Sequence, residues 1–304
     1  MEQLLCPNCQ KAPTSGHPGN LDLLVCEQCD LLWTYISEPI DPDELYSDEV
    51  YQVVDNRGSV FEKIILREAA AVLRQASALR KRPTPGRLLD FGCGKGQFLV
   101  QAKEMGWQAL GVETSAQRAN FAREQYGARV CDDLYESGVI ESGNFELITL
   151  NHVLEHLPRP MPLLEELLRH NLSANGLAYI EVPRLDSWQS NIAGRDWMHL
   201  DIPKHLSHWT EPQLRRALAS LGYKVVARRR FSFHLGVLGM LQALSSRLGY
   251  KDNIIVGLKR KRSFKLVLLV LLLTPVALLL ESMSCPFNRS GIMGLFAQHS
   301  PGSE

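Results

Sequence analysis

Two acidic residues and a run of glycines have the types and spacing of a nucleotide-binding turn. Asp90 and Glu113 stand 23 residues apart, and Asp90 is followed by glycines at alternate positions, Gly92, Gly94 and Gly96. Glycine allows tight turns and lets a ligand approach the backbone closely. The acid inside the turn argues against a phosphate cradle, which requires bare N–H groups and positive charge. A carboxylate at Glu113 can accept hydrogen bonds from a ribose diol, as in other nucleotide-binding βαβ units.

Four of the seven cysteines form two close pairs near the start of the chain, Cys6 with Cys9 and Cys26 with Cys29. Two C-x2-C motifs separated by sixteen residues are typical of a zinc site. Each pair can bind one ion from a tight knuckle, and two knuckles complete a tetrahedron with no open position. We therefore predict a structural zinc ribbon over residues 1–35. A redox-active C-x-x-C pair is the alternative.

The elements that must position the glycine turn alternate between strands and helices. Apolar runs predict strands over residues 87–91, 109–112, 128–131, 145–150, 177–182 and 223–231. Helical spacing of apolar residues predicts helices over 60–79, 97–105, 115–126, 161–172 and 211–221. Asn175 and Gly176 are expected to stop the fourth of these helices. The alternation predicts an α/β fold around a mainly parallel sheet.

The turn has the form D-x-G-x-G-x-G and resembles motif I of the class I S-adenosylmethionine-dependent methyltransferases. The resemblance covers most of residues 60–235. It implies a Rossmann-like seven-stranded sheet and S-adenosylmethionine as the cofactor. By resemblance, the turn passes beside the methionine part of the cofactor and Glu113 holds both ribose hydroxyls. The implied cofactor-binding residues of the turn are Asp90, Gly92, Cys93, Gly94 and Gly96. The alternative is a glycine-rich turn of some other Rossmann-like protein.

An acid just after the third strand usually accepts a hydrogen bond from the adenine amino group in this family. Asp133 is the first candidate for that role and Asp132 the second. Both could also cap the following helix, either instead of binding adenine or in addition to it.

The segment after the fourth strand, residues 151–157, resembles the family's x-x-V-L-E-H-L segment. Asn151 and His152 are therefore expected to line the cofactor site. Glu155 and His156 are expected to form a hydrogen-bonded pair that fixes the loop. Catalysis by His156 is the alternative.

A long loop over residues 184–207 follows the fifth strand and contains further histidines. Loops at the carboxyl ends of parallel strands are where α/β sheets bind substrates. His205 is our first candidate for a general base and His208 the second, because histidine exchanges protons near neutral pH. The alternative is that both orient the loop and cap the next helix.

Composition sets broad limits on the function. The chain has 304 residues, 45% of them hydrophobic, and a formal net charge of zero. Zero net charge gives no global electrostatic reason to expect nucleic-acid binding. Three isolated cysteines and the absence of a recognisable signal peptide fit a reducing cytosol better than a disulfide framework.

A second region, over residues 235–290, goes beyond a minimal methyltransferase. A helical stripe over 235–248 is followed by a basic run, residues 259–265, and then by fifteen uncharged residues, 266–280. That run is short for a bilayer span and contains Pro275. Residues 291–298 are the candidate for the family's antiparallel closing strand, which would return the chain to the sheet. We expect a monotopic segment on the cytoplasmic face of the membrane. A buried helix, a dimer interface and a single span are the alternatives.

The predicted order is a ribbon over 1–35, a linker over 36–59, a methyltransferase core over 60–234, the apolar insertion over 235–290, and a closing strand with a tail over 291–304. The resemblance to enzymes of sugar and polysaccharide gene clusters implies a glycosyl or lipid-linked acceptor. Quinone methyltransferases share the V-L-E-H segment, so an isoprenoid or quinone acceptor is a close competitor. An RNA methyltransferase with a zinc recognition module and a non-catalytic protein of the same fold remain as alternatives. The sequence does not fix the oligomeric state.

Overall fold

The computed structural model describes residues 5–17, 20–36, 55–80, 85–132, 144–260 and 263–300. The chain divides into two compact units. The first, called here the sheet unit, comprises residues 53–182, 214–229 and 294–304. The second, called the composite unit, comprises residues 1–52, 183–213 and 230–293. Most of the predicted linker, and Asp133, lie outside the described residues.

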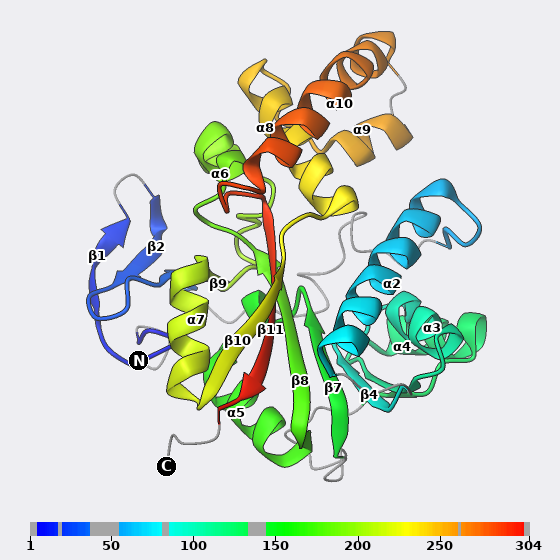
Figure 1. Cartoon of the computed structure of the whole chain (residues 1–304). Helices are drawn as coiled ribbons and strands as arrows, with labels where there is room; N and C mark the ends of the chain where they lie inside the picture. The colour runs from blue at the N-terminus through cyan, green and yellow to red at the C-terminus, as the bar shows by residue number, and fades with distance from the viewer. Residues whose placement is uncertain are drawn as a thin grey trace. The chain divides into compact units, whose positions relative to one another are not determined.

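A seven-stranded sheet forms the centre of the sheet unit and confirms the predicted α/β class (Figure 1). Its spatial order is β10-β11-β8-β7-β4-β5-β6. The strands are β4 (Arg87–Phe91), β5 (Gln108–Val112), β6 (Val130–Cys131), β7 (Phe145–Asn151), β8 (Leu172–Pro183), β10 (Tyr223–Arg229) and β11 (Ile292–His299). β4, β5, β6, β7 and β8 pair in parallel, whereas β10 and β11 pair antiparallel. Strand order reverses at β4, which is where such sheets bind ligands.

The predicted closing strand is confirmed as β11, which lies between β8 and β10. Its side chains from Ile292 to Ala297 are buried, so the strand belongs to the core although it comes late in the sequence. The rest of the predicted strands agree with the structure except at their ends.

Helix α2 (Val60–Arg80) covers one face of this sheet because its apolar residues recur at helical spacing. Its start is stabilised by Ser59, whose Oγ accepts from the backbone N–H of Glu62 at 3.1 Å. The Glu62 carboxylate in turn accepts from the N–H of Gly58 at 2.5 Å. The core beneath includes Val72, Leu73 and Ala76 of α2, Leu99 and Ala102 of α3 (Gln97–Glu104), and Leu88, Leu147, Tyr179 and Phe296 of the strands.

The remaining helices of the sheet unit are α4 (Ala116–Tyr126), α5 (Pro160–Asn171), a short 3-10 helix (Leu154–His156) and most of α7 (Glu211–Ser220). One boundary prediction was wrong. Asn175 and Gly176 do not stop α5, which already ends at Asn171. Leu172 takes an extended conformation and pairs with Phe145, so β8 starts five residues earlier than predicted. Gly176 lies within that strand. A Cβ at this position would lie 3.0 Å from the Phe145 carbonyl oxygen, which favours glycine there.

The composite unit contains a four-stranded sheet of order β1-β2-β3-β9. Its strands are β1 (Pro13–His17), β2 (Asn20–Cys26), β3 (Leu32–Thr34) and β9 (Ser207–His208). The prediction of one continuous loop over 184–207 was wrong. That segment forms helix α6 (Trp188–Ala193), a 3-10 turn (Gly194–Asp196) and then β9, which pairs antiparallel with β3. Because β9 is short and pairs with a strand far away in the sequence, the residues around it show no periodicity that would predict a strand.

Four helical segments complete the composite unit: a π-helical turn (Phe233–Val237), α8 (Leu238–Arg247), α9 (Ile254–Arg260) and α10 (Phe264–Ser284). Within the described residues, α10 is long and apolar enough to span a membrane by length and composition, and 17% of its most apolar window is buried. Pro275 does not interrupt it. The preceding Thr274 donates its hydroxyl proton to the Val270 carbonyl at 2.6 Å, which adds a contact next to the missing N–H.

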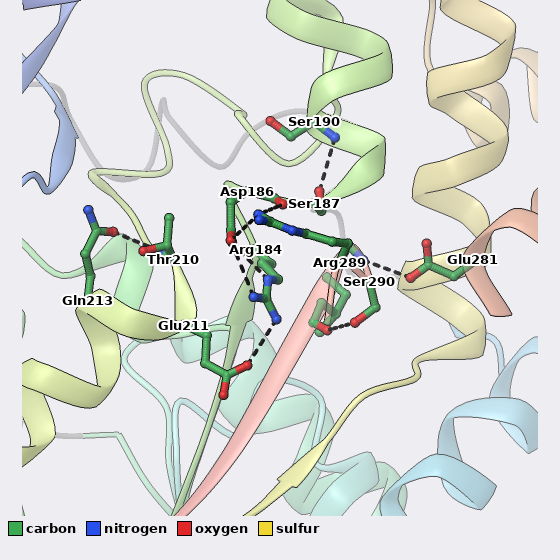
Figure 2. Close-up of polar contacts among 12 residues, drawn as sticks. Arg184, Asp186, Ser187, Ser190, Thr210, Glu211, Gln213, Glu281, Arg289 and Ser290 are labelled. Atoms are coloured by element: carbon green, nitrogen blue, oxygen red, sulfur yellow. Dashed lines mark hydrogen bonds and ion pairs between the residues drawn. The ribbon is translucent and has the colours of Figure 1, made fainter. Parts of the chain in front are cut away.

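A partly buried polar network joins separate segments of the composite unit (Figure 2). Arg184, 4% exposed, contacts Asp186 at 2.9 Å and Glu211 at 3.1 Å. Arg289 reaches the same Asp186 at 2.5 Å. Each arginine is thus paired with at least one carboxylate. The contacts connect the segment after β8 to the start of α7 and to the segment before β11.

Candidate active site

The end of β4 is fixed by a buried carboxylate. Asp90 is 2% exposed and accepts from the Thr149 hydroxyl at 2.6 Å and from the Asn151 amide at 3.1 Å. Burial raises the pKa of Asp90 to about 6, although the two hydrogen bonds act to lower it. Both donors lie on β7, beside β4 in parallel register. Asp90 therefore fixes two strand ends at the switch point and orients Asn151, a predicted cofactor-lining residue.

The three glycines of the turn are required for different reasons, although all have positive φ, at +76°, +54° and +84°. A Cβ on Gly92 would lie 2.4 Å from a Val153 methyl group, and one on Gly96 would lie 2.9 Å from the Ala122 Cβ. A Cβ on Gly94 would meet nothing within 4 Å. Gly92 and Gly96 thus allow close packing, whereas Gly94 faces open space that a ligand can enter.

Glu113 joins this turn to the end of β5. It is 7% exposed; its Oε2 accepts from the Gly94 N–H at 2.8 Å and its Oε1 from the Ser115 N–H at 2.9 Å. Ser115 directly precedes α4, and its side chain makes no capping hydrogen bond. Backbone N–H donors stabilise a carboxylate in its charged form. Each oxygen retains acceptor capacity, so the carboxylate can bind a diol.

Cys93 and Gln97 flank the same turn. The Cys93 side chain packs into the core, and burial raises the pKa of its thiol well above the usual range. Only its backbone is left to face a ligand. Gln97, the first residue of α3, has a buried Nε2 with no hydrogen-bond partner. Sequence reasoning missed Gln97. Its position directly after the last glycine is the signal that could have found it, because an acceptor on a bound ligand would satisfy this donor.

The two candidates for adenine binding have different outcomes. Asp132 follows β6 and forms an ion pair with Arg123 at 3.1 Å, with 53% of its side chain exposed. Asp133 lies outside the described residues. Adenine binding by either residue stays a prediction.

His152 follows β7 with a φ of +55°, an uncommon conformation for a residue with a side chain. Its Nδ1 lies 3.2 Å from Glu155 Oε1 and its Nε2 lies 3.4 Å from Glu181 Oε1. Burial lowers the pKa of His152, but the two carboxylates outweigh burial and raise it to about 9. At neutral pH the ring is therefore an imidazolium held between two buried acids.

A chain of alternating charges extends from this imidazolium. Arg229 lies 2.6 Å from Glu181 and 2.9 Å from Glu68 on α2. Burial raises the pKa of Glu181, but Arg229 and His152 outweigh it and keep that pKa well below its ordinary value. Tyr179 also donates its hydroxyl proton to Glu181. These contacts hold β7, β8, β10 and α2 together at one edge of the sheet.

His156 ends the 3-10 helix, where its N–H donates to the Val153 carbonyl at 3.0 Å. A ring nitrogen of His156 and a carboxylate oxygen of the neighbouring Glu155 lie within 4.8 Å of each other. Glu155 also contacts His152, so it contributes to the buried charge chain as well as to the predicted pair. Catalysis by His156 stays a prediction.

His205 and His208 belong to the composite unit, where Thr34 contacts both residues. The Thr34 hydroxyl donates its only proton to the His205 carbonyl at 2.6 Å. The His208 Nε2 lies 3.0 Å from the same hydroxyl oxygen, so in this second contact Nε2 is the donor and the hydroxyl oxygen the acceptor. The His205 Nδ1 donates to the His199 carbonyl at 2.7 Å. A neutral His205 ring then has its proton on Nδ1 and its lone pair on Nε2. In this tautomer Nε2 can accept a proton, as a general base must. The catalytic roles of both histidines stay predictions.

The four predicted metal ligands come together in the composite unit. The Sγ atoms of Cys6, Cys9, Cys26 and Cys29 all lie within 4.8 Å of one another. Two matching turns present them: Gln10 donates to the Cys6 carbonyl and Asp30 to the Cys26 carbonyl, with φ near +60° at both donors. The Cys9 and Cys26 Sγ atoms are 3.4 Å apart, and those of Cys6 and Cys29 are 3.6 Å apart. Both distances are near the sulfur–sulfur distance of about 3.8 Å expected for four thiolates around a tetrahedral zinc ion.

A match to a family model decides the family. A family model described as "Methyltransferase domain" matches residues 61–228, more than half of the chain. The chain belongs to this methyltransferase family. The methyltransferase fold that the sequence resemblance implies is thereby confirmed.

Solved structures of similar fold agree with this assignment. The plantazolicin methyltransferase BpumL, in complex with a monoazolic desmethylPZN analog and S-adenosylhomocysteine, is 18% identical with a TM-score of 0.51, over 85% of this chain and 93% of that chain. The cyclopropane synthase MmaA2 from Mycobacterium tuberculosis is 13% identical with a TM-score of 0.50, over 85% and 94% of the two chains. At these identities the likeness is one of fold.

A curated relative matches a shorter stretch. The ribosomal RNA small subunit methyltransferase C of Alcanivorax borkumensis is 37% identical over 65 residues, which is 21% of this chain. The match spans only 20% of that protein's own length.

Three observations at the carboxyl ends of β4 and β5 fit S-adenosylmethionine. Gly94 faces open space, the Gln97 amide is a buried donor without a partner, and Glu113 presents a fixed carboxylate. The turn and Glu113 would hold the cofactor, as the sequence resemblance implies.

Replacing Glu113 by Gln should weaken cofactor binding at least tenfold, or about 1.4 kcal/mol. The side chain of the Glu113→Gln variant would keep one acceptor oxygen, but its NH2 group would face the N–H of either Gly94 or Ser115, where two donors meet. The negative charge is also lost. Calorimetric titration with S-adenosylhomocysteine measures the effect. Glu104→Gln, on the exposed end of α3, is the matched control. Equal affinity in the wild type and in Glu113→Gln would remove Glu113 from the binding site.

Replacing His152 by Asn should lower stability in a pH-dependent way. Because the folded-state pKa is raised, the ion pairs contribute fully below the ordinary pKa of 6.5 and are lost as the pH rises through about 9. We expect a loss on the order of 3 kcal/mol at pH 6 and a much smaller difference from the wild type at pH 10.

Denaturant unfolding at several pH values measures this difference. Asn tolerates positive φ, which limits any backbone contribution. The half-exposed His170, replaced by Asn in the same way, is the control. A His152→Asn difference that stays constant from pH 6 to pH 10 would contradict the imidazolium assignment.

Proposed function

We propose that the protein transfers a methyl group from S-adenosylmethionine to a small molecule, either a glycosyl compound, free or lipid-linked, or an isoprenoid of the quinone type. The formal net charge of zero gives no global electrostatic reason to expect a nucleic-acid acceptor. The BpumL structure, similar in fold, contains a small-molecule analog. The apolar α10 supports an acceptor of low polarity.

The observation that carries the proposal is the pair of fixed carboxylates at the switch point of the sheet. When bound there, S-adenosylmethionine supplies a methyl group on a cationic sulfur. Glu113 binds through two oxygens already oriented by backbone N–H groups. Asp90 holds Asn151 in place, and Gly94 leaves room for the ligand. Orientation of the reacting groups by such a rigid edge supplies much of the rate enhancement.

RNA methylation is the second candidate, and one observation favours it. The curated relative that matches 65 residues methylates ribosomal RNA, according to its name. The match is short, and a formal net charge of zero gives no global electrostatic attraction for phosphate groups.

Incubating the protein with radiolabelled S-adenosylmethionine and either a total lipid and small-molecule extract or purified ribosomal RNA should place label in the first fraction only. Glu113→Gln should reduce that label at least tenfold and is the matched inactive variant. Label in RNA would overturn the acceptor assignment but keep the methyltransferase. No label in either fraction from a protein that binds the cofactor would reject both acceptor classes.

We also propose that the four clustered cysteines bind one structural zinc ion. The two matching turns, the mutual proximity of the sulfurs and the complete set of four thiol ligands support zinc. A closed four-sulfur site has no position for substrate, so the metal would stabilise the small sheet rather than take part in catalysis.

Cys26→Ser should lose about one equivalent of zinc and lower the thermal stability of the protein, because the metal holds both turns. Metal analysis by mass spectrometry and a melting curve measure both effects. Cys131→Ser, at an isolated cysteine, is the control and should keep the zinc. Purified wild-type protein that contains no metal, or contains iron instead, would contradict the assignment.

A further inference from the structure

Helix α10 has two apolar faces with different surroundings. Its inner face packs against α8 and α9 through Leu266, Val270, Leu273 and Ala277. The outer face includes seven side chains that are 43–80% exposed: Phe264, Leu268, Leu271, Leu272, Val276, Leu279 and Met283. Their spacing follows one side of a helix over 20 residues, or about 30 Å. An apolar stripe of this length is rarely left exposed to water.

The rotation of α10 about its axis is fixed by Glu281. This side chain is fully buried, and its two oxygens accept from the Gln189 amide and from the Gly291 N–H, both at 2.8 Å. A Cβ on Gly236 would lie 2.8 Å from the same carboxylate, so the fit is close. α10 therefore cannot roll to bury its outer face without breaking these hydrogen bonds.

The chemistry of the outer face fits lipid better than protein. Between Leu266 and Leu280 the helix contains no charged residue, whereas protein interfaces have a polar rim. The basic run over residues 259–265 contains five Lys or Arg and no acid, and it ends at exposed Lys265 in the first turn of α10. Basic residues near an anionic membrane surface contribute about 1 kcal/mol each.

The buried inner face argues against a full span. A helix that crosses a bilayer alone is surrounded by lipid, but α10 packs one side on α8 and α9 and turns Glu281 toward the protein. We propose that the outer face of α10 inserts into one leaflet of a membrane that contains anionic lipid. None of the residues of this outer face is among those that would hold the cofactor.

Flotation of the full-length protein with lipid vesicles tests the proposal. We expect the wild type to float with phosphatidylcholine vesicles that contain 30% phosphatidylglycerol, and at least tenfold less with phosphatidylcholine alone. Leu271→Glu should lose flotation while its affinity for S-adenosylhomocysteine stays unchanged, which shows that the fold is intact. The matched control is Val60→Glu, an exposed apolar residue at the start of α2, which should float like the wild type.

Two results would overturn the proposal. One is a wild-type protein that is monodisperse without detergent and floats with neither vesicle. The other is a dimer that becomes monomeric in Leu271→Glu while neither protein floats, because the face would then bind a second copy. Both readouts are independent of methyl transfer, so failure here leaves the proposed acceptor untouched.

Discussion

The candidate site depends on one buried carboxylate at the end of β4. Asp90 has almost no contact with solvent, and both of its hydrogen-bond donors come from β7, the neighbour across which the strand order reverses. A buried acid without donors would be strongly destabilising, so the two strand ends must stay in register. The glycine turn that follows Asp90 and the residues that follow Asn151 take their positions from this pairing.

A second constraint lies a few residues further along the same edge. Glu155, His152, Glu181, Arg229 and Glu68 alternate in charge and come from four elements and the segment after β7. Each charge is buried or nearly so, and each is compensated by a neighbour of opposite sign. Such a chain tolerates the loss of a member poorly, because removal leaves an uncompensated charge in the interior. It also keeps His152 protonated and in a strained backbone conformation beside the cofactor turn.

The sequence predicted the features whose cause is local. Helical and strand periodicity located the elements of the sheet unit, and the C-x-x-C spacing brought four sulfurs together as expected. Long-range contacts were missed. The pairing of β9 with β3 joins segments more than 170 residues apart, and the sequence around Ser207 has no strand periodicity that would predict it. His152 was expected to line the cofactor site, but its partners Glu181 and, beyond it, Arg229 are set by tertiary packing. The outward direction of Leu271 on α10 likewise depends on the burial of Glu281.

The position of β11 determines the order in which the protein can fold. This strand is the last in the sequence, yet it lies inside the sheet between β8 and β10. During synthesis, β8 and β10 emerge first and must wait for the strand that separates them, and the whole of α10 emerges in that interval. Contacts between segments distant in sequence form late, because the chain between them must be ordered first. The most apolar helix therefore leaves the ribosome before the sheet is complete, and the nascent chain exposes that helix at the stage when it is most prone to aggregate.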